Sequence, residues 1–151
     1  VTFTCMGHGV KGMRIVATNG CFDIIHAGHV QYLNEARSLG DKLIIGLNSD
    51  KSVRQLKGED RPYNTQQNRA EVLMALESVD QVIIFDSIDC RGFLKNVRPD
   101  IYVKGGDYTI DTLPECERKT ILSYCKEVKI LKKYDSLSTS QIIEKLQLTD
   151  K

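Results

Sequence analysis

Short apolar runs, rich in Ile and Val, alternate along the chain with longer stretches that have helical periodicity. The apolar runs are predicted strands, at residues 14–18, 43–47, 81–85, 101–104 and 128–131. They are continuous instead of alternating with polar positions, which is typical of parallel strands covered on both faces. The stretches between them predict helices at residues 28–39, 65–78, 89–97, 115–125 and 139–147.

The alternation of strand and helix predicts the fold. Parallel strands joined by right-handed helical crossovers form an open, doubly wound sheet. We therefore expect a five-stranded parallel α/β sheet of Rossmann-like topology. Ligands of such sheets bind beyond the carboxyl ends of the strands. Polar clusters follow the predicted strands at residues 19–29, 48–50, 105–107 and 138–140, and one crevice could gather all four.

Composition limits the chain to one domain and restricts the classes of partner that it is expected to bind. The 151 residues are 41% hydrophobic and 27% charged, which suits a single sizeable core. A net charge of +1 argues against a nucleic-acid-binding surface. No run approaches the roughly 18 apolar residues of a membrane span, and the N-terminus lacks the order of a signal peptide. We therefore expect a cytoplasmic protein that binds neither nucleic acid nor membrane.

Two other features are not expected to carry chemistry. The five cysteines are widely spaced without a Cys-x-x-Cys pair, which disfavours a disulfide framework and a structural zinc site. Gly7–Gly12 has the G-x-G-x-x-G spacing of a dinucleotide-binding turn, but it precedes the first predicted strand and no helix follows it. A dehydrogenase is therefore a remote alternative. We expect residues 1–13 to be an N-terminal extension, disordered or foreign to the domain at 14–151.

The strongest chemical signal is the segment Thr18–His29, where a strand gives way to a glycine turn and then to a helix start. Gly20 permits a phosphate to approach the backbone. His26 and His29 lie three residues apart around Gly28, so both imidazoles can face one crevice beside the amides and positive dipole of the helix. The segment predicts an anion site with two added donors. Alternatively, the histidines only cap the helix, or they hold zinc, for which the sequence places no third ligand.

This segment resembles the signature of the cytidylyltransferase-like nucleotidyltransferases. Gly20-Cys21-Phe22-Asp23 followed by His26-Ala27-Gly28-His29 carries the resemblance, and Ser138-Thr139-Ser140 is similar to the second, Ser/Thr-rich motif of that superfamily. Within it, the chain is most similar to the heptose 1-phosphate adenylyltransferases. The segments that support this branch are 18–23, 48–50, 56–58 with 61–62, 75–77 with 79–80, and 103–108.

The resemblance implies a reaction. ATP and a heptose 1-phosphate would give ADP-heptose and pyrophosphate by in-line attack on the α-phosphorus, with Mg²⁺ carried on the ATP phosphates and no metal site in the protein. His26 and His29 would donate hydrogen bonds to the phosphates in the transition state. Lys57, on a polar loop, would reach the reacting phosphates, unless it is simply solvated. The resemblance also implies a homodimer.

Further residues are expected to bind the two substrates. Those assigned to the nucleotide are Asn19, Gly20, Cys21, Phe22, Gly28, Lys104, Gly105, Asp107, Lys133, Ser138 and Thr139. Those assigned to the acceptor are Asp23, Asn48, Asp50 and Arg69. Other interpretations stay open, because Asp107 fits an ordinary Gly-Gly-Asp turn and the hydroxyls at 138–139 could only cap the last helix. Asp23 could instead orient the loop or a histidine.

The chain departs from the superfamily pattern after its second motif. Many members have an arginine there, where this chain reads Gln-Ile-Ile-Glu-Lys at 141–145. Lys133 is therefore our candidate for the group that clamps the triphosphate. The histidine motif does not select the base, so a cytidylyltransferase acting on glycerol 3-phosphate is the alternative enzyme. A nucleotide-binding regulatory module is the alternative without catalysis.

Overall fold

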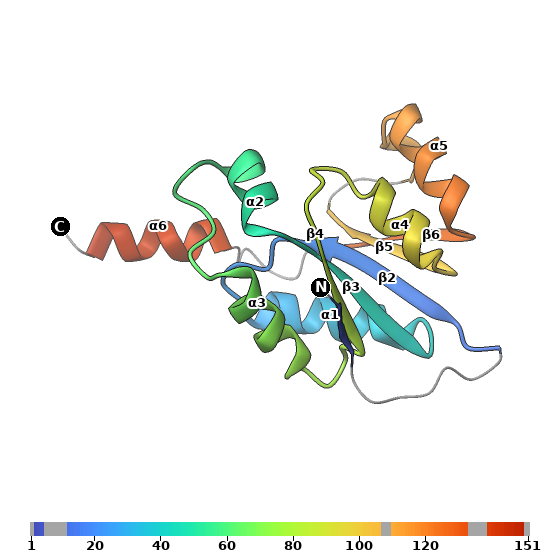
Figure 1. The fold of residues 1–151 in the computed structure, drawn as a ribbon, viewed down its shortest axis with the longest axis horizontal. Coiled ribbons are helices and arrows are strands. Elements are labelled where there is room, and N and C mark those ends of the chain that lie inside the picture. Colours follow the sequence, from blue (N-terminus) through green and yellow to red (C-terminus); the bar gives the residue numbers. More distant parts are fainter. Residues whose placement is uncertain (1, 5–11, 107–109, 133–138, 150–151) are drawn as a thin grey trace.

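The computed structural model describes residues 2–4, 12–106, 110–132 and 139–149, and it shows a sheet with helices on both faces (Figure 1). The parallel strands are β2 (Ile15–Gly20), β3 (Lys42–Asn48), β4 (Gln81–Phe85), β5 (Ile101–Gly105) and β6 (Glu127–Leu131). They lie in the order β4-β3-β2-β5-β6, with each neighbouring pair parallel. The predicted doubly wound, five-stranded parallel sheet is confirmed.

The sheet has one strand beyond those predicted. β1 (Thr2–Thr4) pairs antiparallel with β4 and forms an edge of the sheet. It belongs to the segment that we expected to be an extension outside the domain, of which residues 5–11 lie outside the described ranges. A strand of three residues is too short to show a period in the sequence.

Helices cover the two faces of the sheet in pairs (Figure 1). One face carries α1 (Ala27–Ser38) and α3 (Gln66–Met74), and the other carries α4 (Arg91–Val97) and α5 (Glu115–Tyr124). A 3-10 turn, η1 (Ile110–Thr112), precedes α5. Two more helices follow carboxyl ends of strands, α2 (Asp50–Lys57) after β3 and α6 (Thr139–Thr149) after β6. From this edge α6 extends away from the sheet (Figure 1).

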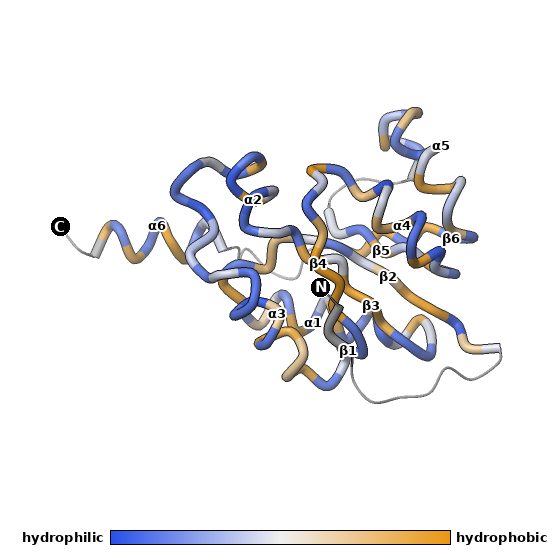
Figure 2. Tube along the Cα trace, in the orientation of Figure 1, coloured by the Kyte–Doolittle hydropathy of each residue, from blue (hydrophilic) through white to orange (hydrophobic). Residues whose placement is uncertain are grey.

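The central strand β2 presents alternate residues to the two faces, as the pleat of a strand requires. Val16 packs in the apolar cluster under α1 and α3, whereas Ala17 packs in the cluster under α4 and α5. Thr18 then contacts Tyr32 of α1, and Asn19 contacts Tyr102, which packs in the cluster under α4 and α5. The strands are the most apolar part of the chain and run between these helix layers (Figure 2). This alternation decides on which side of the sheet each functional residue lies.

Helix α2 was not among the predicted helices. Only Val53 and Leu56 are apolar between residues 50 and 57, so the segment has no clear helical period. Its ends are nevertheless well defined, because the Ser49 hydroxyl caps the start by accepting the Ser52 amide at 3.2 Å. Lys57, which we expected on a polar loop, is therefore the last residue of a helix.

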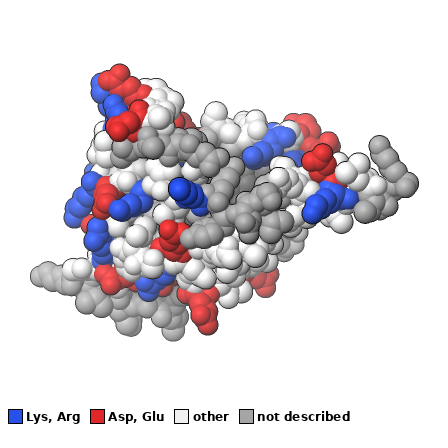
Figure 3. Space-filling view, turned by 180° about the vertical axis from the view of Figure 1, so that it is seen from behind, with Lys and Arg blue, Asp and Glu red and all other residues white. Residues whose placement is uncertain are grey.

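The surface carries charges of both signs. Lys and Arg side chains are interspersed with Asp and Glu over the face shown in Figure 3, in keeping with the net charge of +1. None of the helices in the described ranges combines the length and the apolar character needed to cross a bilayer.

Candidate functional site

The loop after β2 leads into α1 through His26, which stands immediately before the helix with an extended backbone (φ −135°, ψ 176°). Its Nδ1 accepts a hydrogen bond from the Gly28 amide at 3.1 Å, and the Nδ1 of His29 accepts one from the His26 amide at 3.3 Å. The two rings thus cap the helix reciprocally, with their centroids 3.9 Å apart. The structure brings together the two histidines that the sequence singled out. The Gly28 amide, which was expected to bind the nucleotide, donates to His26 in this cap.

These caps decide which nitrogen of each ring carries the proton. A neutral imidazole has one N–H, and the nitrogen that accepts a hydrogen bond is the other one. Because both Nδ1 atoms accept, the proton of each ring is on Nε2. Nε2–H is therefore the donor that His26 and His29 can offer to an anion near the positive end of the α1 dipole.

Burial keeps both imidazoles neutral. Desolvation lowers the pKa of His26, and desolvation together with the neighbouring His26 ring lowers the pKa of His29 to about 4. At pH 7 the uncharged form of both rings therefore dominates. Their contribution at an anion site is directed N–H donation, because neither carries a charge of its own.

Phe22 packs behind the histidine pair. Its ring centroid lies 5.5 Å from that of His29, and its backbone adopts the left-handed conformation, with φ 46°. The turn folds the ring back over Gly20, where a Cβ atom would lie 2.9 Å from it. Gly20 is thus required by the packing of Phe22. The phosphate contacts expected of both residues stay predictions.

Asp23 is buried and holds the segment 61–64 against this loop. Its carboxylate accepts hydrogen bonds from the Arg61 Nε at 3.0 Å and from the amides of Tyr63 and Asn64, each at 2.9 Å. Burial alone would raise the pKa of Asp23, but the two amides and the guanidinium outweigh it and lower that pKa. The ionised carboxylate is therefore engaged within the chain, and its expected contact with the acceptor stays a prediction.

Arg69 connects several segments from the interior. Its fully buried guanidinium donates to the carbonyls of Cys21 at 2.7 Å and Asn48 at 2.8 Å. It also donates to the Asn64 carbonyl at 3.0 Å and the Asp50 carboxylate at 2.9 Å. These contacts fix the ends of β2 and β3 relative to the start of α2. Direct substrate contact by Arg69, Asn48 and Asp50 stays a prediction.

Lys57 acts electrostatically on the loop after β2. Burial raises the pKa of the Cys21 thiol, while the positive charges of Lys57, Arg69 and Arg61 act in the opposite direction, Lys57 most strongly. Lys57 is exposed at the end of α2. Its ammonium can therefore approach this loop from the solvent side, and its expected contact with the reacting phosphates stays a prediction.

The start of α6 contacts the same loop. The Thr139 hydroxyl donates to the Ile24 carbonyl at 2.9 Å, which joins residues 115 positions apart. This contact places Thr139 of the second predicted motif beside the loop that carries the first. Ser138, Lys133 and Asp107 lie outside the described residues, so their expected roles stay predictions.

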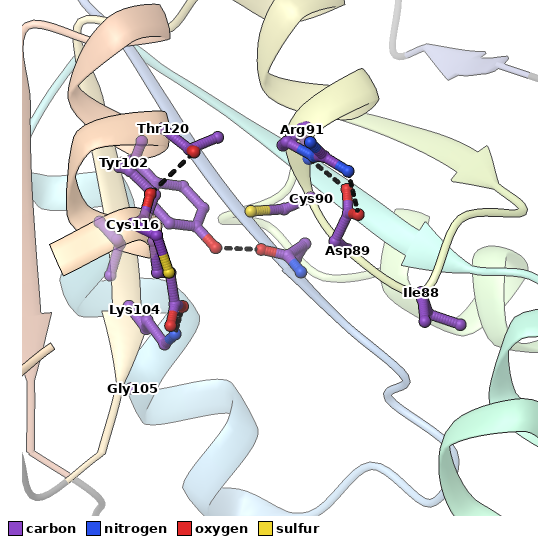
Figure 4. Close-up of a pocket in the computed structure, with 13 residues that line it drawn as sticks. Ile88, Asp89, Cys90, Arg91, Tyr102, Lys104, Gly105, Cys116 and Thr120 are labelled. Carbon is purple, nitrogen blue, oxygen red and sulfur yellow. Dashed lines mark hydrogen bonds and ion pairs between the residues drawn. The ribbon is translucent and has the colours of Figure 1, made fainter. Parts of the chain in front are cut away.

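Asn19, Lys104 and Gly105 line a cavity of about 630 Å³ on the α4–α5 side of the sheet (Figure 4). Asn19 accepts a hydrogen bond from the Tyr102 hydroxyl, and Lys104 forms an ion pair with Glu117 of α5. The histidines stand at the start of α1, on the other face. The single crevice that we expected to gather these clusters stays a prediction.

Sequence reasoning did not single out Tyr102, Glu117 or the anchoring role of Asn64. Tyr102 and Glu117 fall inside a predicted strand and helix, where they look like ordinary positions, and Asn64 resembles a helix-opening residue. Their roles arise from contacts across 83, 13 and 41 positions of sequence. No local pattern signals such contacts.

The sheet order and the capped histidine pair at the end of its central strand define the class, an α/β domain of the nucleotidyltransferase fold. More particularly, the chain belongs to the cytidylyltransferase-like family, whose model matches residues 17–145. The matched region includes the histidine pair and the start of α6.

Individual relatives agree with this membership. The bifunctional protein HldE of Alcanivorax borkumensis is 49% identical over 140 residues, which cover 93% of this chain and 29% of that protein. HldE of Wolinella succinogenes is 50% identical over 139 residues, which cover 91% of this chain and 28% of that protein. The crystal structure of the lipopolysaccharide core biosynthesis protein from Thermoplasma volcanium is 29% identical with a TM-score of 0.69, covering 82% of this chain and 100% of that one. The chain thus spans less than a third of the length of these HldE proteins.

Proposed function

We propose that the chain is an adenylyltransferase that joins AMP from ATP to a heptose 1-phosphate, giving ADP-heptose and pyrophosphate. Three facts support this: the family membership, the 49% identity to a bifunctional HldE protein, and the motifs that resemble the heptose branch. The observation that carries the chemistry is the pair of neutral imidazoles, each with its proton on Nε2, at the start of α1.

In the proposed reaction, an oxygen of the sugar phosphate attacks the α-phosphorus of ATP in line with the bond to the β-phosphate. A new P–O bond forms, and the old bond breaks with its electron pair leaving on pyrophosphate. Negative charge grows on the α-phosphoryl oxygens and on the leaving group, where positioned donors stabilise it. His26 and His29 would supply two such donors from Nε2–H, and no covalent protein intermediate is needed.

Other residues would bind the remaining phosphates. Lys57 would bring its charge to the transferred phosphoryl group from the end of α2, and Thr139 with Ser138 would meet the β- and γ-phosphates at the start of α6. Mg²⁺ belongs to the ATP substrate in this proposal. Within the described ranges, no group of three or more His, Cys, Asp or Glu side chains is placed to hold a metal ion.

Pyrophosphate release tests the proposal. ATP and CTP are offered in turn with both anomers of heptose 1-phosphate and with glycerol 3-phosphate. We expect release to be fastest with ATP and one heptose anomer. A clear preference for CTP and glycerol 3-phosphate would instead support the cytidylyltransferase alternative. Tight ATP binding without release across the panel would indicate a regulatory module and overturn the proposal.

Location and assembly follow from the same proposal. We place the chain in the cytoplasm and, from the resemblance, in a homodimer. Light scattering on the eluting protein measures the assembly directly, and a mass of one chain would contradict the dimer.

A further inference from the structure

The two strands at the centre of the sheet separate before they reach its carboxyl edge. The backbone pairing of β2 with β5 ends at Ala17 and Tyr102. On their other sides, β2 stays paired with β3 up to Gly20, and β5 stays paired with β6 up to Gly105. The split lies where the order of the parallel strands reverses, which is the point at which doubly wound sheets bind ligands.

A side chain of α1 bridges this split. The Tyr32 hydroxyl lies 2.8 Å from the Thr18 hydroxyl of β2 and donates to the Val103 carbonyl of β5 at 3.3 Å. Since a phenol has one proton and gives it to Val103, the Thr18 hydroxyl is the donor of the first bond. Thr18 and Val103 each follow the last paired residue of their strand. The Tyr32 hydroxyl therefore joins the two strands at the point where their backbone pairing stops.

The ring of Tyr32 also lies close to the end of β5. A Cβ atom on Gly105 would lie 3.1 Å from the ring, so the missing side chain of this glycine allows the close approach. Tyr32 is half-buried and packs against the apolar cluster under α1 and α3. His29 precedes it by three residues in the same helix, and residues at this spacing lie on one helix face. Tyr32 thus relates the position of the histidine pair to that of the end of β5.

A second bridge crosses the split on the opposite face of the sheet. The Tyr102 hydroxyl of β5 donates to the side chain of Asn19, which lies beyond the last paired residue of β2. This bridge joins the two strands to each other, whereas the bridge made by Tyr32 joins both strands to α1. Loss of the Tyr32 hydroxyl would therefore release α1 while Tyr102 still holds the strands together.

We propose that Tyr32 is a positioning residue, whose hydroxyl sets the distance between the histidine pair and the end of β5. The inference rests on the proposed adenylyltransferase function and deepens it. Tyr32 acts through α1 and contacts none of the reacting atoms. Because a displacement of about 1 Å at a reacting group can cost about 10²-fold in rate, a small shift of α1 should reduce turnover more than substrate binding.

Removal of the hydroxyl alone tests the proposal. Tyr32→Phe keeps the ring, and we expect kcat for pyrophosphate release to fall about tenfold while KM for ATP and for heptose 1-phosphate each stay within about threefold. Tyr124→Phe is the matched control, because Tyr124 ends α5 on the other face of the sheet, with the Arg98 guanidinium 5.5 Å from its ring centroid. The control should keep kcat within about twofold of the parent, and an equally small effect of Tyr32→Phe would overturn the positioning role.

A double variant separates positioning from stability. Tyr32→Phe leaves the Thr18 hydroxyl without its acceptor, and Thr18→Val removes that hydroxyl with little change of shape. We expect the double variant to recover most of any loss in the urea midpoint. Its kcat should stay about tenfold low, because the bond to Val103 is still absent. Recovery of kcat together with the midpoint would show that Tyr32 only stabilises the fold, and would overturn the proposal.

Nuclear Overhauser effects test the geometry without turnover. We expect a contact between the Tyr32 ring protons and the Gly105 α-protons, and we expect it to weaken in Tyr32→Phe while contacts between Val16 and Leu33 in the core are unchanged. An unchanged contact to Gly105 would overturn the positioning role whatever reaction the chain performs. If this contact weakens but the parent releases no pyrophosphate across the substrate panel, the proposed function alone is overturned.

Discussion

His26 uses its two ring nitrogens for different purposes. Nδ1 accepts the Gly28 amide and caps α1, whereas Nε2–H is the donor proposed for the phosphates. A serine at this position could still accept an amide at the helix start, since Ser is among the best N-cap residues. Its short side chain has no second group that could replace the Nε2–H donor. The two purposes can therefore be separated by one substitution.

We expect His26→Ser to lower kcat by about 10²–10³, the usual effect of losing one transition-state donor. The free energy of unfolding should change by less than about 1 kcal/mol, because the cap is kept. His29→Ala removes a donor and a cap acceptor together, so it should lose similar activity and also about 0.5–2 kcal/mol of stability. Pyrophosphate release and urea unfolding measure the two effects. Activity of His26→Ser within a few-fold of the parent would remove this imidazole from the mechanism.

The sequence predicted the histidine pair but not the buried charges around it. A three-residue spacing at a helix start places two rings side by side in any α-helix, so His26 and His29 could be grouped without coordinates. Arg69 was expected on the acceptor side, and Asp23 either there or orienting the loop, but neither expectation included burial, because charged side chains are usually exposed. Their burial depends on partners 48 and 38 positions away, which no local pattern specifies.

Among the elements, the segment 61–64 depends on Asp23 for its attachment to the β2–α1 loop. Asp23→Asn keeps the shape of the side chain but removes the charge that pairs with Arg61. It also places an NH2 group, which cannot accept hydrogen bonds, where a carboxylate oxygen accepts from backbone amides. We expect a loss of about 2–4 kcal/mol in the free energy of unfolding, as for other broken buried charge networks. Urea unfolding measures it. Glu115→Gln, which breaks an exposed pair, should cost under about 0.5 kcal/mol, and equal costs for both would contradict this role.

The contact between β3 and α4 depends on Gly46. A Cβ atom there would lie 2.9 Å from the Phe93 ring, inside van der Waals contact. We expect Gly46→Ala to destabilise by about 1–3 kcal/mol, whereas Gly92→Ala, which meets nothing within 4 Å, should be neutral or stabilising. Thermal unfolding compares them. Adding Phe93→Leu should recover part of the Gly46→Ala loss, and strict additivity of the two would show that the ring is not the obstacle.

Elements with a strong apolar period could be predicted, and those held by caps or by partners could not. The five parallel strands are buried on both faces, so their sequences are continuously apolar. Helix α2 is short and has Val53 as its buried apolar residue, and its boundaries come from Ser49 and Gly58. β1 exists through pairing with β4. Both depend on tertiary structure more than on local pattern.

At the scale of the whole molecule, the carboxyl edge of the sheet is held together by contacts between segments that are far apart in the sequence. Arg69 ties the end of β2 to that of β3, and Thr139 ties α6 to the same loop. We therefore expect a disturbance at the start of α1 to lower the free energy of unfolding of the whole domain, and not only to open the structure locally. Acid provides such a disturbance, because protonation of His29 on Nδ1 would remove the acceptor of the His26 amide.

The direction and the pH window of this acid effect follow from the pKa of His29. It is about 4 in the folded chain against 6.5 for an ordinary histidine, so between these values the unfolded chain binds a proton that the folded chain does not. The contribution of neutral His29 to the free energy of unfolding is complete above pH 6.5 and is lost as the pH falls from there through 4. His26 shifts in the same direction, and the lowered pKa of Asp23 acts only below its usual value of 3.8.

Between pH 7 and 4.5 we therefore expect the free energy of unfolding to fall by on the order of 1 kcal/mol, after allowing for the partial exposure of the ring. Urea unfolding at constant ionic strength measures this fall. His29→Asn cannot titrate in the window and should show a shallower dependence on pH, although its stability at pH 7 is lower. If the free energy of unfolding of His29→Asn fell with pH as steeply as that of the parent, the protons would bind at other groups. That result would contradict the lowered pKa of His29.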